Sequence, residues 1–301
     1  GLVGLSFPAG SLAIGYYVFF TFFKLWAYYH VVRQHWGFFR LYKSKADDFD
    51  PRWERLDTWF FNLMLYLPLL LFFTAPFYLQ TPGFYPDLGL QRPLAGGLTL
   101  AGVFRPLFWT LYIGALGAYA LSLWKRRSEG ESLNGAKLAF LFSIVPLHLI
   151  VYAASPLLAA FVIPIVTVGH NIQYHRIIWD YARKKYYADG KKTAQRYPWA
   201  RRAYSSWLAY GAIGIVFTFA CYRGPWIIWL RKALGGLIDD SIVNASLSTA
   251  GFGEASYSGV GESVAFAFII GWALQHYYLD SKIWRMSSDP EVRRLLGVES
   301  D

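Results

Sequence analysis

The chain has 301 residues, of which 55% are hydrophobic, 20% are aromatic and only 16% are charged. This composition is too apolar for a soluble domain of that length. Cys221 is the only cysteine, so an intramolecular disulfide and a cluster of thiolate metal ligands are both excluded.

Apolar runs of about 18 residues or more predict membrane-spanning helices. Such runs cover roughly 10–38, 57–79, 105–125, 136–153, 155–180, 204–222 and 260–286. We therefore expect an all-α fold, a polytopic bundle of about seven transmembrane helices that forms a single membrane domain over residues 1–301. Ser155 and Pro156 predict a helix start after a tight turn between the fourth and fifth runs. Because residue 1 is Gly and the chain enters a helix almost at once, we also expect an N-terminal portion to precede it.

The net charge of +10 would suit a nucleic-acid partner, but its distribution indicates a membrane orientation instead. If the spans alternate in direction, the first, third, fifth and seventh spans all end on one side. Most of the 29 basic residues follow those ends. The positive-inside rule makes that side cytoplasmic, and the expected membrane is the bacterial inner membrane. We expect attraction to anionic lipids and no nucleic-acid partner.

All six histidines lie in apolar helix-like segments or on their last turns. Because three histidine clusters close odd-numbered spans, we expect them at one depth near the cytoplasmic boundary, with His148 deeper. Neutral imidazole is the commonest metal ligand, and ionisable groups at membrane depth are usually functional. The candidate metal ligands are His30, His35, His148, His170, His175, His276 and Asp280.

The spacing within two clusters imposes a condition on this site. His30 and His35 are five residues apart, as are His170 and His175. On a regular helix this separation rotates the side chains by about 140°, so each pair shares one ion only across a π-bulge or an unwound turn. The alternative for each histidine is an interfacial or hydrogen-bonded role, and for Asp280 it is a surface ion pair.

Imidazole and carboxylate ligands without thiolate suit iron, and also zinc, copper or manganese. With this ligand set we expect one or two ions. A site among apolar helices favours chemistry with dioxygen on an apolar substrate, since both partition into the bilayer. The chain has no Gly-rich nucleotide-binding loop, so any reductant must come from a partner protein.

Segments 33–42, 169–176 and 276–284 resemble motifs of histidine-rich bacterial membrane proteins. More broadly, the chain resembles integral-membrane non-haem iron oxygenases, which include the fatty-acid desaturases and hydroxylases and the bacterial carotene-cleaving dioxygenases. The resemblance implies desaturase-type boxes at the two His-x4-His pairs. The His-x2–3-His-His boxes of desaturases and the Pro-His-Gly…Asp-His signature of carotene dioxygenases are absent from this sequence.

These features favour an integral-membrane, metal-dependent oxygenase or hydroxylase that modifies a lipid-soluble substrate and receives electrons from an external reductase. A second hypothesis is a haem-binding electron-transfer subunit with two axial histidines. A third is a structural or transport subunit of a larger membrane complex.

Overall fold

The computed structural model describes residues 13–81, 84, 88–187, 195–222 and 289–297, and these are helical without any strand. The chain divides into two compact units. The N-terminal unit comprises Ala13–His170, and the described part of the C-terminal unit begins at Asn171. Each unit is treated by itself.

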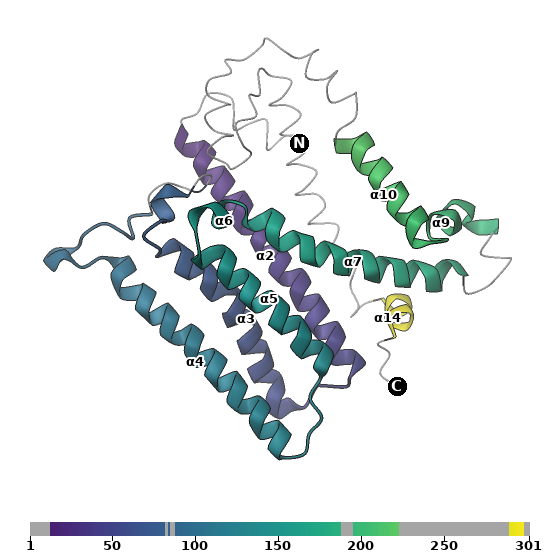
Figure 1. Cartoon of the computed structure of the whole chain (residues 1–301), viewed down its shortest axis with the longest axis horizontal. Helices are drawn as coiled ribbons and strands as arrows, with labels where there is room; N and C mark the ends of the chain where they lie inside the picture. Colours follow the sequence, from purple (N-terminus) through teal and green to yellow (C-terminus); the bar gives the residue numbers. More distant parts are fainter. Residues whose placement is uncertain (1–12, 82–83, 85–87, 188–194, 223–288, 298–301) are drawn as a thin grey trace, which may run out of the picture. The chain divides into compact units, whose positions relative to one another are not determined.

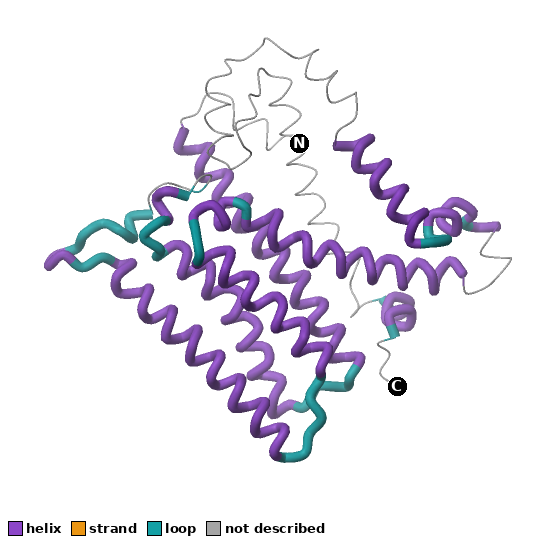
Figure 2. Tube along the Cα trace, in the orientation of Figure 1, coloured by secondary structure: helices purple, strands orange, loops and turns teal. Residues whose placement is uncertain are grey.

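The N-terminal unit is built on four long helices: α2 (Ala13–Lys45), α3 (Pro51–Phe73), α4 (Leu100–Ser128) and α5 (Gly135–Ala153). Helix α3 packs against both α4 and α5, and α2 packs against α5 (Figures 1 and 2). Short loops at 46–50 and 129–134 join α2 to α3 and α4 to α5. We call the end of the bundle that carries both loops the loop end.

Helix starts in this unit follow from capping side chains. The Asp50 carboxylate accepts a hydrogen bond from the Arg52 amide, with Pro51 at the first position of α3. Ser155 accepts from the Leu158 amide at the start of the short helix α6 (Pro156–Ala160), as the sequence predicts. Both caps satisfy amide groups that the first helical turn leaves without partners. Two 3-10 turns, η1 (Tyr78–Gln80) and η2 (Ala95–Gly97), lie in the connection between α3 and α4.

The C-terminal unit takes up most of α7 (Val162–Tyr187), together with α9 (Pro198–Ala203), α10 (Trp207–Tyr222) and α14 (Pro290–Leu296). Within this unit, the Lys184 ammonium of α7 donates to the Leu295 carbonyl of α14 over 2.6 Å. Lys185 forms an ion pair with Glu291 at 3.2 Å.

The all-α prediction is confirmed for the described residues. Among those residues, three helices are long and apolar enough to cross a membrane: α3, α4 and α5. They correspond to the predicted spans 57–79, 105–125 and 136–153. These three helices support the assignment to a membrane.

The described residues do not support the prediction of seven spans. Helix α10 has 16 residues and is too short for a usual span. Helices α2 and α7 are long, but they carry lysine, histidine, glutamine and many tyrosines within their apolar runs. Tyrosine prefers the membrane interface to the hydrocarbon, so these runs are less apolar than their aromatic content implies. The predicted span at 260–286 lies outside the described residues.

Candidate functional site

A buried polar cluster joins three helices in the middle of the N-terminal unit. It consists of Tyr28 on α2, His148 on α5 and the Leu65 carbonyl on α3, and the two side chains are 1% and 0% exposed. The Tyr28 hydroxyl donates a hydrogen bond to the Leu65 carbonyl. The same hydroxyl oxygen lies 2.7 Å from Nδ1 of His148.

This arrangement determines the tautomer of His148. A tyrosine hydroxyl has one proton, and here that proton is directed to Leu65. Nδ1 of His148 must therefore be the donor to the Tyr28 oxygen, which leaves Nε2 with an available lone pair. Nε2 is buried and makes no hydrogen bond within the described part of the chain. His148 thus has the protonation pattern of an imidazole ligand.

His35 lies beside His148 in this core. The two ring centroids are 5.3 Å apart in an edge-to-face arrangement, and His35 is 2% exposed. Two imidazoles that bind one tetrahedral ion, with nitrogen–metal distances of about 2.0–2.1 Å, have centroids about 5 Å apart. The spacing of His35 and His148 is therefore one that a single metal ion can share.

His30 does not share this position. Helix α2 is an uninterrupted α-helix between His30 and His35, without a π-bulge or an unwound turn. The two side chains therefore face different directions, and His30 is only half-buried. The sequence predicted both histidines on the last turn of their helix. Because α2 continues to Lys45, they instead lie well inside it. His148 on α5 is a neighbour of His35.

The remaining predicted ligands lie in the C-terminal unit or have side chains outside the described residues. His175 is exposed in the C-terminal unit, and its Nδ1 lies 2.6 Å from the Tyr210 hydroxyl. His170 is on α7, and its side chain is not described. His276 and Asp280 lie outside the described residues. Over the described ranges, no group of three or more His, Cys, Asp or Glu side chains is placed to hold a metal ion.

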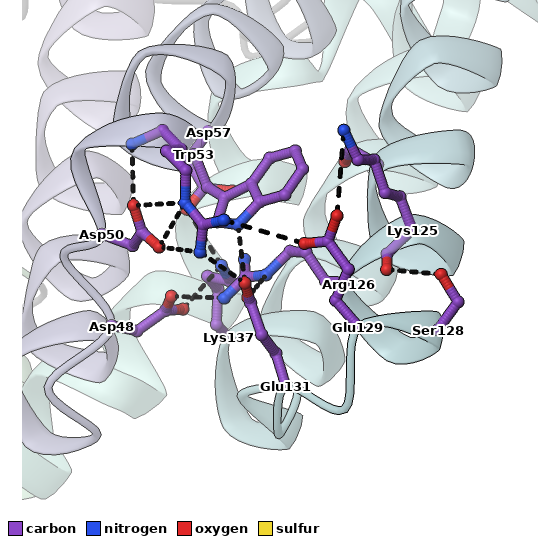
Figure 3. A network of polar contacts seen from close by, with 12 residues as sticks. Asp48, Asp50, Trp53, Asp57, Lys125, Arg126, Ser128, Glu129, Glu131 and Lys137 are labelled. Atoms are coloured by element: carbon purple, nitrogen blue, oxygen red, sulfur yellow. Dashed lines mark hydrogen bonds and ion pairs between the residues drawn. The ribbon is translucent and has the colours of Figure 1, made fainter.

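A second polar cluster lies at the loop end of the N-terminal unit (Figure 3). Asp57 is 2% exposed and forms ion pairs with Lys43 and, at 2.9 Å, with Lys137. The Tyr119 hydroxyl donates to the other Asp57 oxygen over 3.1 Å. One carboxylate therefore connects α2, α3, α4 and α5.

Asp48 extends this network through the loop that joins α2 to α3. It pairs with Lys137 at 2.6 Å and with Arg126 at 2.9 Å, and Arg126 also pairs with Glu131 at 3.0 Å. Burial raises the pKa of the Asp48 carboxyl, but hydrogen bonds from Lys137 and Arg126 outweigh burial and hold the pKa below its ordinary value. We call the six side chains of Lys43, Asp48, Asp57, Arg126, Glu131 and Lys137 the loop-end network.

The loop-end network has three acidic and three basic members, so its formal charges cancel. Such a balanced set joins helices and offers no excess charge to a ligand. Sequence reasoning did not identify it. Asp57 and Lys137 could have indicated this network, because each lies within the first turn of a predicted span. A charge at that position is costly unless it is paired.

A cavity of about 370 Å³ lies among α3, α4 and α5. At one side of it, the Phe60 and Tyr119 rings stack at 3.8 Å. Its size is at the lower end of ligand pockets, which span about 300–1,000 Å³. The lining is apolar and does not include His148, so the cavity does not lead to the histidine pair. The lining residues are Phe60, Tyr112, Leu116, Tyr119, Ala120, Leu123, Leu138, Leu141, Phe142, Val145, Pro146 and Leu149.

No family model, curated protein or solved structure matches this chain. Its chemistry must therefore be inferred from its own residues.

Proposed function

We propose that this chain is an integral-membrane, metal-dependent oxygenase or hydroxylase that acts on a lipid-soluble substrate, with iron as the favoured ion. The observation that carries the proposal is His148. Its Nδ1 is held by Tyr28, its Nε2 has an available lone pair in a dry core, and His35 lies beside it. The resemblance to membrane non-haem iron oxygenases supports the same type of ligand.

The roles of the residues follow from their chemistry. Tyr28 selects the tautomer of His148 and fixes the orientation of its ring, as a hydrogen-bonded partner of a metal ligand does. His148 and His35 would each supply one imidazole. A redox ion held by imidazoles with open coordination positions activates dioxygen. His170, His276 and Asp280 are the sequence-based candidates for further ligands.

The proposed setting is the bacterial inner membrane, with the loop end of the N-terminal unit in the cytoplasm. The basic residues at that end support this orientation, among them Lys43, Lys45 and Lys125–Arg127. An electron donor would be a separate reductase. The surrounding lipid would supply the substrate.

The geometry of the pair favours a single ion over a haem. An iron between two axial imidazoles would place their centroids about 6 Å apart, with the macrocycle between the rings. Instead, the centroid of the His35 ring lies 5.3 Å from that of His148 and 5.8 Å from that of Phe140, in a packed core. The edge-to-face rings of His35 and His148 leave no space for a porphyrin between them.

A structural or transport subunit of a larger complex is the second candidate. The observation that favours it is α4, whose outer surface exposes large apolar side chains such as Ile113, Leu121 and Trp124. Such a surface suits lipid and also suits a neighbouring subunit.

Metal analysis of the purified full chain tests the proposal. We expect first-row metal without a haem absorption band, and we expect His148→Gln and His35→Gln each to remove most of it. Tyr28→Phe should weaken metal binding about 10- to 100-fold, because the Nδ1 partner is lost. Tyr119→Phe removes another buried hydroxyl, whose partner is Asp57 at the loop end, so it should bind metal like the wild type.

The reaction itself is tested with iron-loaded protein, bacterial lipid extract, a reductant and isotopically labelled dioxygen. Incorporation of label into a lipid product, lost in His148→Gln, is the expected result. A well-folded wild-type chain that binds no metal and labels no lipid would leave the structural subunit as the better interpretation.

A further inference from the structure

The apolar cavity in the N-terminal unit is elongated along its helices. Helices α4 and α5 both pack against α3, and the cavity of about 370 Å³ lies among the three (Figure 1). Its lining runs from Tyr112 to Leu123 on α4 and from Leu138 to Leu149 on α5. Each stretch advances by eleven residues, which is about 16 Å at the rise of an α-helix. We call this cavity the apolar slot.

One side of the apolar slot opens to the outside of the bundle. Phe142 on α5 and Leu116 on α4 both line the slot, and they are 75% and 39% exposed. The helices α3, α4 and α5 are the three that are long and apolar enough to cross a membrane. In a bilayer, the outside of such helices is hydrocarbon, so the opening gives lipid chains access to the slot.

The lining of the slot selects a hydrocarbon over water or a polar ligand. Ten of its twelve lining residues have purely apolar side chains, and the other two are Tyr112 and Tyr119. The Tyr119 hydroxyl already donates to Asp57. A water molecule in a cavity needs several polar partners, which this lining does not offer. A hydrocarbon chain instead supplies the dispersion contacts that an empty cavity lacks.

The length and position of the slot fit one leaflet of a bilayer. Its length of about 16 Å is close to half of the hydrocarbon core, which is about 30 Å thick. At the loop end, the slot finishes at Leu123, and the exposed Trp124, Lys125 and Arg127 follow directly. Exposed tryptophan and basic residues are typical of the membrane interface. The slot therefore extends from headgroup level at the loop end toward the middle of the bilayer.

We propose that the apolar slot holds one acyl chain of an anionic phospholipid from the leaflet at the loop end. The headgroup of this lipid lies beside Lys125 and Arg127, whose positive charges suit its phosphate. The lining does not include His148, so the lipid is a resident component of the bundle and is separate from the substrate of the proposed metal centre. The inference depends on the membrane assignment of α3, α4 and α5 and is independent of metal binding.

Photo-crosslinking with the full chain in phosphatidylcholine vesicles tests the proposal. The probe is phosphatidylglycerol with a diazirine either near the carbonyl or near the end of one acyl chain, and mass spectrometry locates the modified residues. The label near the carbonyl should react close to Leu123 and Leu138, and the label near the chain end close to Tyr112 and Leu149. Both signals should saturate with increasing probe, and unlabelled phosphatidylglycerol should compete.

A variant that fills the slot provides the second measurement. Ala120 lines the slot, and Ala120→Trp places an indole where the acyl chain would lie. We expect its saturable labelling to fall about tenfold, the effect of losing the burial of about two methylene groups. The matched control is Ala118→Trp, because Ala118 is exposed on the same helix and does not line the slot. Its labelling should equal that of the wild type.

Circular dichroism of both variants establishes that the helices are retained. Equal labelling of folded Ala120→Trp and Ala118→Trp would overturn the proposal. If Ala120→Trp does not fold, the wild type alone decides. Labelling that rises in proportion to the probe without saturation is that of bulk lipid and overturns the proposal, as does a reversed order of the two labels along the helices.

Discussion

Tyr28 controls which nitrogen of His148 is available, because its single hydroxyl proton is committed to the Leu65 carbonyl. Sequence reasoning identified His148 as a candidate ligand but did not identify Tyr28 as its partner. The reason is physical: in a helix with apolar residues on every face, periodicity does not determine how the helix is rotated toward its neighbours. The partner of a buried histidine depends on that rotation.

Asp57 is buried, and its carboxylate connects the four long helices of the N-terminal unit. We expect Asp57→Asn to lower the free energy of unfolding by about 3 kcal/mol, because it removes one partner from two buried lysines. This expected loss of stability is at the lower end of the range for breaking a buried ion pair, because Lys43 still pairs with Glu54 and Lys137 still pairs with Asp48. Unfolding of the full chain in mixed micelles of increasing denaturing detergent measures the change.

Asp50→Asn is the matched control for Asp57→Asn. The Asp50 carboxylate is partly exposed and pairs with the exposed Arg52 at 2.6 Å, and an asparagine in its place still caps α3. Because an exposed ion pair contributes at most about 1 kcal/mol, the unfolding transition should move much less than in Asp57→Asn. An Asp57→Asn variant as stable as this control would show that the loop-end network does not stabilise the bundle.

Asp48 makes the stability of the bundle dependent on pH. Its folded pKa lies below the ordinary value of 3.8, so the carboxylate stabilises the fold above that pH. This contribution is lost as the pH falls through the folded pKa. The thermal midpoint of the wild type should exceed that of Asp48→Asn by a constant amount between about pH 5 and 7, and the gap should shrink below about pH 4. A gap that stays constant down to pH 3 would contradict the assignment.

At the scale of secondary structure, the start of α5 is joined to the end of α2 by one side chain. The Asn134 oxygen accepts from the Lys137 amide, and its amide nitrogen donates to the Tyr42 carbonyl, both over 3.0 Å. We expect Asn134→Ala to cost about 1–2 kcal/mol of unfolding free energy, because both bonds are lost. Asn134→Ser keeps a capping oxygen but cannot reach Tyr42, so its loss should be smaller.

Thr99→Ala provides a comparison for Asn134→Ala. Thr99 caps α4 through a 2.9 Å bond to the Gly102 amide. Its removal should cost about 1 kcal/mol, as for a simple cap. Equal losses at the two positions would mean that the bond to Tyr42 contributes nothing. Thermal unfolding of the three variants in one detergent makes the comparison.

The start of α6 was predictable from the sequence, whereas the end of α2 was not. Ser155 and Pro156 predict the start of α6 correctly, because capping and the fixed φ of proline are local effects. The end of α2 lies seven residues beyond the predicted 38, at Lys45. The residues 39–45 are aromatic and basic, and their helical conformation depends on Phe39, Leu41 and Lys43 being buried against other helices. Tertiary packing of this kind is not readable from a single sequence.

At the scale of the whole molecule, the assignment to a membrane can be tested by its orientation. In a chain whose Cys221 is replaced by alanine, an impermeant thiol reagent added outside intact cells should label Leu94→Cys and leave Ser128→Cys unlabelled. Both positions are exposed, and they lie in the connection between α3 and α4 and at the loop end, respectively. Labelling at Ser128→Cys alone would place the loop end outside the cell.

The loop-end network has a consequence for how the protein is assembled during synthesis. The α2–α3 hairpin emerges first and pairs Lys43 with Asp57, which leaves the Asp48 carboxylate without a cation. The α4–α5 hairpin pairs Arg126 with Glu131 and leaves Lys137 in excess. Within the loop-end network, each hairpin alone therefore has one uncompensated charge, and the two charges are of opposite sign. The bond between Asp48 and Lys137 forms only when the two hairpins meet. Docking of the second hairpin removes both unpaired charges at once, so a half-synthesised bundle differs electrostatically from a finished one.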